Sequence, residues 1–271
     1  MKILLILTLI GTFVAALYLG QGKLIYHPRP YNSGDTDKKN IIRLTYVTSQ
    51  GAQTVFYAPP RTNPASPPAE LWLMFGGNAS LALDWYDFIN RYPDPGAGFL
   101  LIDYPGYGHS QGVPTPETIL ESTRKAISSL AAHLQVDDHY FPGKLNAVGH
   151  SLGAGVALLF ASRRPTGSLI LIAPFTSLKD MARLVVGKPL DAFLKHNLDN
   201  RARLDEIMSQ NHPPEVTIVH GANDNVIPVS MARELAARHP AIQYHEISNT
   251  GHNMILTAAM PTIYEAMLQS P

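Results

Sequence analysis

Short apolar runs alternate with helical segments through most of this 271-residue sequence. The runs lie at residues 71–75, 98–102, 145–148, 169–173, 216–220 and 242–247. The helical segments lie at residues 80–92, 116–134, 152–162, 231–238 and 261–268. Strands that are apolar along their whole length need helices on both faces, which is typical of a mostly parallel sheet. The pattern therefore predicts one α/β domain, and the length suits a single large core.

Two further β-rich runs precede this alternation. Residues 41–47 and 54–58 are separated by the turn-forming segment Ser49-Gln50-Gly51-Ala52. Two such runs with a short polar connection predict a β-hairpin. We expect this hairpin to add antiparallel strands at one edge of the sheet.

Residues 176–213 interrupt the regular alternation. This region contains helical stretches at residues 177–186 and 191–198, mixed with polar residues. A long insertion after a strand of an α/β sheet is commonly functional. We predict that residues 176–213 form a small cap over an active site.

Composition excludes several classes of function. The formal net charge is +0 and no run of Lys or Arg occurs, so a nucleic-acid partner is not expected. The chain has no Cys, which excludes disulfides, thiolate metal sites and a catalytic Cys. The 11 His residues show no ligand spacing, and no phosphate-binding Gly loop with its Lys occurs. We therefore predict neither a metal nor a cofactor.

The N-terminus carries an uncharged apolar stretch at residues 3–20. Its length lies near the lower limit for a membrane-spanning helix and near the upper limit for a signal peptide. No good small-x-small cleavage motif follows it, so we predict that residues 1–22 remain attached as a membrane anchor. Residues 23–271 would then be an exported catalytic domain, joined to the anchor by a short connector at residues 21–31. Secretion after cleavage of a signal peptide is the alternative.

The segment Gly149-His150-Ser151-Leu152-Gly153 matches the pattern G-x-S-x-G. A predicted strand enters it and an apolar helix leaves it, which is the context of a nucleophile elbow. The glycines permit a sharp turn that lifts the Ser hydroxyl above the sheet. We predict that Ser151 is a nucleophile, with an ordinary helix N-cap as the alternative.

A Ser nucleophile needs a base, and the base needs an orienting carboxylate. His252 lies in a loop between the last predicted strand and the last helix, and is the predicted base; His220, at a strand end, is its competitor. Asp224 is the carboxylate in the loop after residues 216–220. The chain order Ser…Asp…His supports these roles. An Asx turn is the alternative reading of Asp224.

The segment Phe75-Gly76-Gly77-Asn78-Ala79 follows the first apolar run. Gly-rich loops expose backbone N–H groups that can bind an oxyanion. We predict that the backbone N–H groups of Asn78 and Leu152 form the oxyanion hole, with Gly77 as second choice for the former.

These segments resemble the α/β-hydrolases, in order and from Leu24 onward. They are FGGNAS (75–80), DYPGYGHSQG (103–112), GHSLG (149–153), HGANDNVIP (220–228) and NTGHNM (249–254). The segments LIYHP (24–28) and APFTSL (173–178) look like a subgroup of small, lid-poor hydrolases with an N-terminal membrane anchor, which includes protein depalmitoylases and bacterial relatives. The resemblance implies an eight-stranded sheet and the three roles given above. One position departs from it, since Gly76 stands where the family often has His.

The predicted activity is cleavage of acyl esters or thioesters, in small-molecule or lipid-like substrates, through an acyl-enzyme on Ser151. A peptidase or amidase that uses the same residues is the first alternative. A non-catalytic binding protein with this fold is the second.

Overall fold

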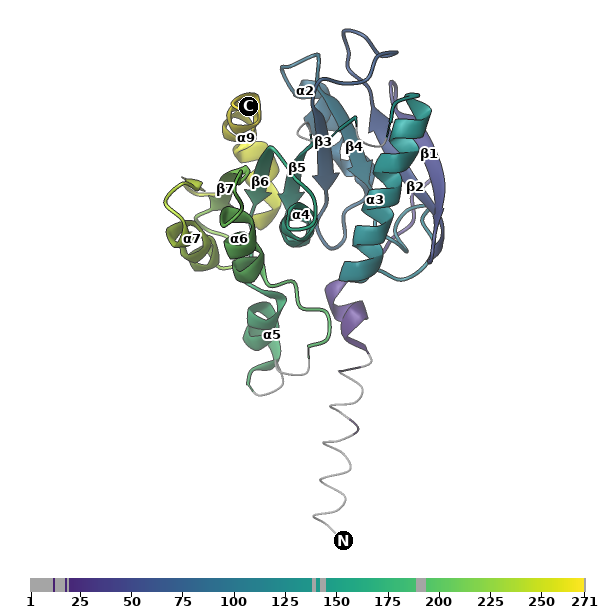
Figure 1. Ribbon diagram of the computed structural model, residues 1–271. Coiled ribbons are helices and arrows are strands. Elements are labelled where there is room, and N and C mark those ends of the chain that lie inside the picture. Colours follow the sequence, from purple (N-terminus) through teal and green to yellow (C-terminus); the bar gives the residue numbers. More distant parts are fainter. Residues whose placement is uncertain are drawn as a thin grey trace.

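The computed structural model describes residues 12, 18, 20–137, 140–141, 145–188 and 194–270. An eight-stranded sheet lies at its centre, in the order β1-β2-β4-β3-β5-β6-β7-β8 (Figure 1). The strands are β1 Ile42–Thr48, β2 Gly51–Ala58, β3 Leu71–Phe75, β4 Gly98–Ile102, β5 Leu145–His150, β6 Ser168–Ile172, β7 Glu215–Gly221 and β8 Gln243–Ile247. Strand β2 runs antiparallel to β1 and β4, and the other pairs are parallel. The predicted parallel sheet with a hairpin at one edge is confirmed.

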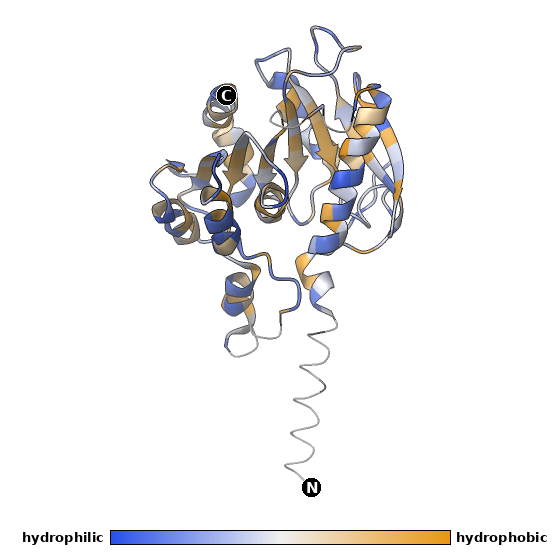
Figure 2. Cartoon of the chain, in the orientation of Figure 1, coloured by the Kyte–Doolittle hydropathy of each residue, from blue (hydrophilic) through white to orange (hydrophobic). Residues whose placement is uncertain are grey.

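Helices cover both faces of the sheet. They are η1 Ala82–Trp85, α2 Tyr86–Arg91, α3 Pro116–His133, α4 Leu152–Ala161, α5 Leu178–Val186, α6 Asn200–Met208, α7 Val229–Arg238, η3 His252–Met254, α8 Ile255–Ala258 and α9 Met260–Leu268. Residues of α3, α4, α6 and α7 share one core with Leu73, whereas those of η1, α2, α8 and α9 share the other with Trp72 and Met74. Successive side chains of a strand point to opposite faces, so β3 contributes to both cores. Figure 2 shows the central strands as a hydrophobic layer between these helices.

The chain order reverses between β4-β3 and β5-β6, which places a topological switch point beside β3 and β5. Ligands of open α/β sheets bind outside the carboxyl ends of the strands at such a point. Both predicted glycine-rich loops, after β3 and after β5, lie there.

The predicted cap region divides into two parts. Helix α5 is present as expected, and its N-cap is Ser177, whose hydroxyl accepts the N–H of Asp180 at 3.0 Å. Helix α6 packs against α4 in the helix layer, so it belongs to the body of the domain. Its N-cap is Asp199, which accepts the N–H of Ala202 at 3.1 Å.

The predicted helix at residues 191–198 is wrong for its described part. Residues 191–193 lie outside the described residues, and residues 194–198 are not helical. The Lys195 N–H donates to Gln21 Oε1 at 2.5 Å, and the Leu198 carbonyl accepts from the Leu178 N–H at 3.1 Å. Partners elsewhere in the chain therefore take the backbone groups that a helix would have paired internally.

The predicted connector at residues 21–31 is also different from expectation. Residues 20–25 are helical and lie beside the α5 end of the molecule (Figure 1). Gln21 and Tyr26 are buried, with exposed fractions of 7% and 2%. This part of the N-terminal region is therefore packed into the domain.

Within the described part of the chain, no helix is both long enough and apolar enough to cross a membrane. Of the apolar stretch at residues 3–20, only Thr12, Tyr18 and Gly20 are among the described residues. The anchor therefore stays a prediction.

Candidate active site

Ser151 lies in the sharp turn between β5 and α4. Its backbone has φ 57° and ψ −118°, a strained conformation for a residue with a side chain. The Ser151 N–H donates to the Ile172 carbonyl at 2.8 Å, which fixes the turn to β6. A Cβ atom on Gly149 would lie 2.2 Å from the Gly153 carbonyl oxygen, and one on Gly153 would lie 2.1 Å from that of Phe75. Glycine is required at both positions, because any side chain there would collide with these backbone atoms.

We expect Gly153→Ala to lower the free energy of unfolding by about 3 kcal/mol, because the added methyl meets backbone atoms that cannot rotate away. Urea denaturation measures this loss. Gly22→Ala is the matched control, since a Cβ there meets nothing within 4 Å. Equal stability of the two variants would contradict the steric account of the turn.

The structure brings Ser151, His252 and Asp224 into one hydrogen-bonded line. The Ser151 hydroxyl donates to His252 Nε2 at 3.1 Å, and His252 Nδ1–H donates to Asp224 Oδ2 at 2.6 Å. The side chain of Asp224 is fully buried and that of His252 is 8% exposed. The loops that carry the two residues are joined, because the Asn223 N–H donates to the Thr250 carbonyl at 3.0 Å.

Asp224 makes an Asx turn and also binds His252, so both roles that the sequence suggests for this residue are present in the structure. Its Oδ1 accepts the N–H groups of Val226 and Ile227, each at 2.8 Å, while Oδ2 faces His252. Burial by itself raises the pKa of the Asp224 carboxyl, but the hydrogen bonds from His220, His252 and the backbone outweigh it. They hold the pKa well below its usual range, so Asp224 is an anion at neutral pH.

His220 contacts the acid and does not replace His252 at the nucleophile. It is fully buried, and its Nε2 lies 3.0 Å from the Ile227 carbonyl oxygen and 3.3 Å from Asp224 Oδ2. Both neighbours are acceptors, so Nε2 carries the proton. His220, the alternative candidate for the base, therefore acts as a second hydrogen-bond donor that holds Asp224 in place.

We expect His220→Ala to lower kcat/KM by about tenfold, the equivalent of one hydrogen bond to a charged group. His220→Gln should recover most of the loss, because its amide N–H can reach the same acceptors. Steady-state kinetics on both variants, with a thermal melt of each, separates positioning from folding. If His220→Gln were as slow as His220→Ala at equal stability, the donor role would be refuted.

His150 lies inside the elbow motif and contributes to the site, although no feature of the sequence distinguishes it. Its ring lies 5.1 Å from that of His252, at 33°. Burial, and then repulsion from His252, lower the pKa of His150 to about 3. His150 is therefore neutral, and it can pack on the His252 ring without opposing a positive charge there.

The two predicted oxyanion donors lie at the same cavity as Ser151. Leu152 begins α4, where the N–H has no intrahelical acceptor. The loop of Asn78 is fixed from behind, because its carbonyl accepts the Tyr107 hydroxyl at 2.5 Å and the His27 N–H at 2.9 Å. Position 76, where the family often has His, has no room for a side chain here, because a Cβ on Gly76 would lie 2.7 Å from Cβ of Ser80.

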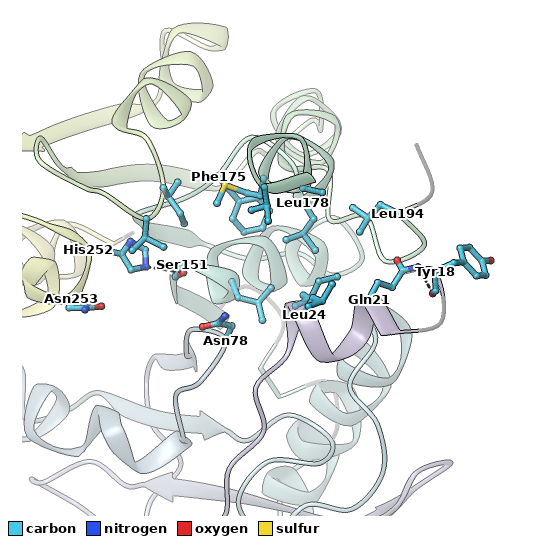
Figure 3. A pocket seen from close by; sticks show the side chains of 17 residues that line it. Tyr18, Gln21, Leu24, Asn78, Ser151, Phe175, Leu178, Leu194, His252 and Asn253 are labelled. Atoms are coloured by element: carbon cyan, nitrogen blue, oxygen red, sulfur yellow. Dashed lines mark hydrogen bonds between the residues drawn. The ribbon is translucent and has the colours of Figure 1, made fainter. Parts of the chain in front are cut away.

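A cavity of about 540 Å³ opens from Ser151 and passes beneath α5 (Figure 3). Its walls are mostly aliphatic, and none of its described lining residues is Asp, Glu, Lys or Arg. The polar atoms near Ser151 are those of Asn78, His252 and Asn253. In the described part of the chain, no group of three or more His, Asp or Glu could hold a metal ion.

This sheet order, with a Ser elbow after β5 and a His–Asp pair after β8 and β7, defines a hydrolase of the α/β class. Comparison with known proteins agrees. The family described as alpha/beta hydrolase fold matches residues 73–196. An uncharacterized protein of Mycobacterium tuberculosis is 30% identical over 237 residues, which cover 86% of this chain and 80% of the relative. The chain belongs to the α/β-hydrolase superfamily.

Two further similarities concern proteins with stated activities. A lysophosphatidylserine lipase of Danio rerio is 28% identical over 196 residues, which cover 63% of this chain and 50% of the lipase. The structure of an esterase of Pyrococcus furiosus superposes with a TM-score of 0.66 at 13% identity, covering 91% of this chain and 98% of the esterase. At that identity the structural similarity shows the fold.

Proposed function

We propose that this chain is a serine hydrolase that cleaves acyl esters or thioesters through an acyl-enzyme. The observation that carries the proposal is the line Ser151–His252–Asp224 at the mouth of an apolar cavity. A buried, fully hydrogen-bonded carboxylate behind a His that reaches a strained Ser is the arrangement that activates a Ser nucleophile. The lipase among its similar proteins supports the same reaction class.

In the proposed reaction, Ser151 Oγ attacks the acyl carbonyl carbon as His252 Nε2 takes the hydroxyl proton. The oxyanion is held by the N–H groups of Leu152 and Asn78. Collapse breaks the bond to the alcohol or thiol, which leaves with the proton from His252. Water then attacks the acyl-enzyme by the same route and releases the acid and free Ser151. Asp224 keeps the Nδ1 proton in place throughout and stabilises the imidazolium.

Labelling with a fluorophosphonate probe, followed by substrate comparison, tests the proposal. We expect the probe to modify Ser151, and we expect p-nitrophenyl acyl esters and acyl thioesters to be cleaved much faster than peptide substrates. None of the described residues that line the apolar cavity has a carboxylate, ammonium or guanidinium group that could bind the termini of a peptide. Faster peptide cleavage would establish the peptidase alternative, whereas failure of the folded protein to label would establish the non-catalytic one.

On the acid side of the optimum, activity should fall no more steeply than about tenfold for each pH unit, because neither Asp224 nor His150 adds a proton to the slope in that interval. Asp224 does not add a second step there, since its pKa is held well below the usual range. His150, with its pKa lowered to about 3, stays neutral in the same interval. The pH profile of kcat/KM on a p-nitrophenyl ester measures the slope. A two-proton slope would contradict this account of Asp224 and His150.

We also propose that residues 3–20 hold the enzyme at a membrane, with the catalytic domain exported, as in the anchored subgroup that the sequence resembles. The uncharged run supports this placement. Fractionation of cells that express the full chain tests it. Recovery in the soluble fraction, with a shortened N-terminus, would replace the anchor by a cleaved signal peptide.

A further inference from the structure

The N-terminal segment forms one wall of the cavity that opens from Ser151. Tyr18, Gln21, Leu24 and Ile25 all line it. The opposite wall comes from α5 and the residues just before it. Without the N-terminal segment, the cavity would be open along this whole side.

This segment is held by specific contacts. The Gln21 side chain accepts the Lys195 N–H at 2.5 Å through Oε1 and donates to the Tyr18 carbonyl at 2.7 Å through Nε2. Tyr26, at the end of the helical turn, is 2% exposed and lies 6.0 Å from the His196 ring. A buried amide that spans two segments in this way fixes their relative position. The N-terminal wall of the cavity is therefore packed and hydrogen-bonded as part of the folded domain.

The cavity is elongated and its polarity changes along its length (Figure 3). Ser151 and His252 lie at one end, and Tyr18 and Gln21 lie at the other. Between these ends the lining is apolar, with Leu24 on the N-terminal wall facing the side of Phe175 and Leu178. An unbranched hydrocarbon chain fits such a channel, because it is long and apolar and has no hydrogen-bonding groups that would need partners in the walls.

We propose that Tyr18 and residues 20–25 are a substrate-binding element, and that the acyl chain of the substrate lies between them and α5. The preferred substrates are then esters or thioesters of medium to long unbranched acyl chains, and Leu24 helps to set the accepted length. This inference rests on the function proposed above. Burial of each added methylene in such a channel raises kcat/KM by about fourfold until the channel is full.

The proposal also constrains the processing of the chain. Cleavage of a signal peptide after any of residues 18–22, near the end of the apolar stretch, would remove Tyr18, and cleavage after residue 21 or 22 would remove Gln21 as well. The active enzyme therefore retains both residues, and its N-terminus lies before Tyr18. The N-terminal segment would then have two roles: it would connect the domain to a membrane, and it would form one wall of the active site.

A chain-length series tests the assignment. Hydrolysis of p-nitrophenyl esters from acetyl to palmitoyl is measured for the full chain, for Leu24→Trp and for Leu268→Trp. Both leucines lie in exposed helical positions, 63% and 52% exposed, but Leu268 is on α9 and does not line the cavity. The larger ring at position 24 should lower the palmitoyl-to-butyryl ratio of kcat/KM by about tenfold. Leu268→Trp should leave this ratio unchanged.

Three results would overturn the proposal. One is an unchanged chain-length profile in Leu24→Trp, and another is an equal shift in Leu268→Trp. The third comes from acetate esters of increasing alcohol length: a stronger length dependence there would place the leaving group in the channel instead. Failure of the proposed function looks different, because then the full chain would neither label with a fluorophosphonate nor cleave even the acetyl ester.

Discussion

Ser151→Ala is expected to lower kcat by about 10⁴-fold or more, because no other group can form the acyl-enzyme. The fold should persist. The strained turn depends on Gly149, on Gly153 and on the hydrogen bond from the Ser151 N–H to the Ile172 carbonyl, and the substitution removes none of these. Turnover of a p-nitrophenyl ester, with circular dichroism and a thermal melt, measures both halves of this expectation.

Ser162→Ala is the matched control for the nucleophile. Ser162 caps the C-terminus of α4, at the opposite end of the helix from Ser151, and its hydroxyl donates to the Leu159 carbonyl at 3.0 Å. This variant should retain its rate and its reaction with the fluorophosphonate. Retention of most activity in Ser151→Ala, by contrast, would end the proposed mechanism.

Asp224→Asn should cost somewhat less than loss of Ser151, about 10³- to 10⁴-fold in kcat. The amide retains one oxygen, which can still accept the N–H groups of Val226 and Ile227, so the loop stays folded. Its NH₂ group, however, faces His252 Nδ1, which must then become an acceptor. The proton moves to Nε2, and His252 can no longer accept the Ser151 proton.

Asp205→Asn is the control for the acid. Asp205 forms an ion pair with Arg238 and a hydrogen bond with His239 at the surface, and Asp199 caps α6, so neither carboxylate takes part in the Ser151–His252–Asp224 line. We expect Asp205→Asn to leave kcat unchanged. A silent Asp224→Asn would mean that Asp224 does not orient the base.

The sheet and its Ser elbow could be predicted from the sequence because their signals are local. Apolar runs such as residues 71–75 and 145–148 carry the strand pattern in their own side chains. The two glycines around Ser151 are spaced four residues apart in the elbow motif, and a Cβ on Gly149 would first meet Gly153 itself. The chain order of Ser151, Asp224 and His252 follows from the strand ends on which they lie.

The wall of the cavity and the surroundings of Asp224 could not be predicted in this way. Gln21 meets Lys195 from far along the chain, and that contact turns an expected connector into part of the site and keeps residues 194–198 from forming a helix. His220 was identified as a competing base, but its packing against Ile227 and Asp224 makes it a donor to the acid. Local sequence encodes periodicity and turn geometry, whereas the partner of a buried polar group depends on which distant segments the completed fold brings within hydrogen-bonding distance.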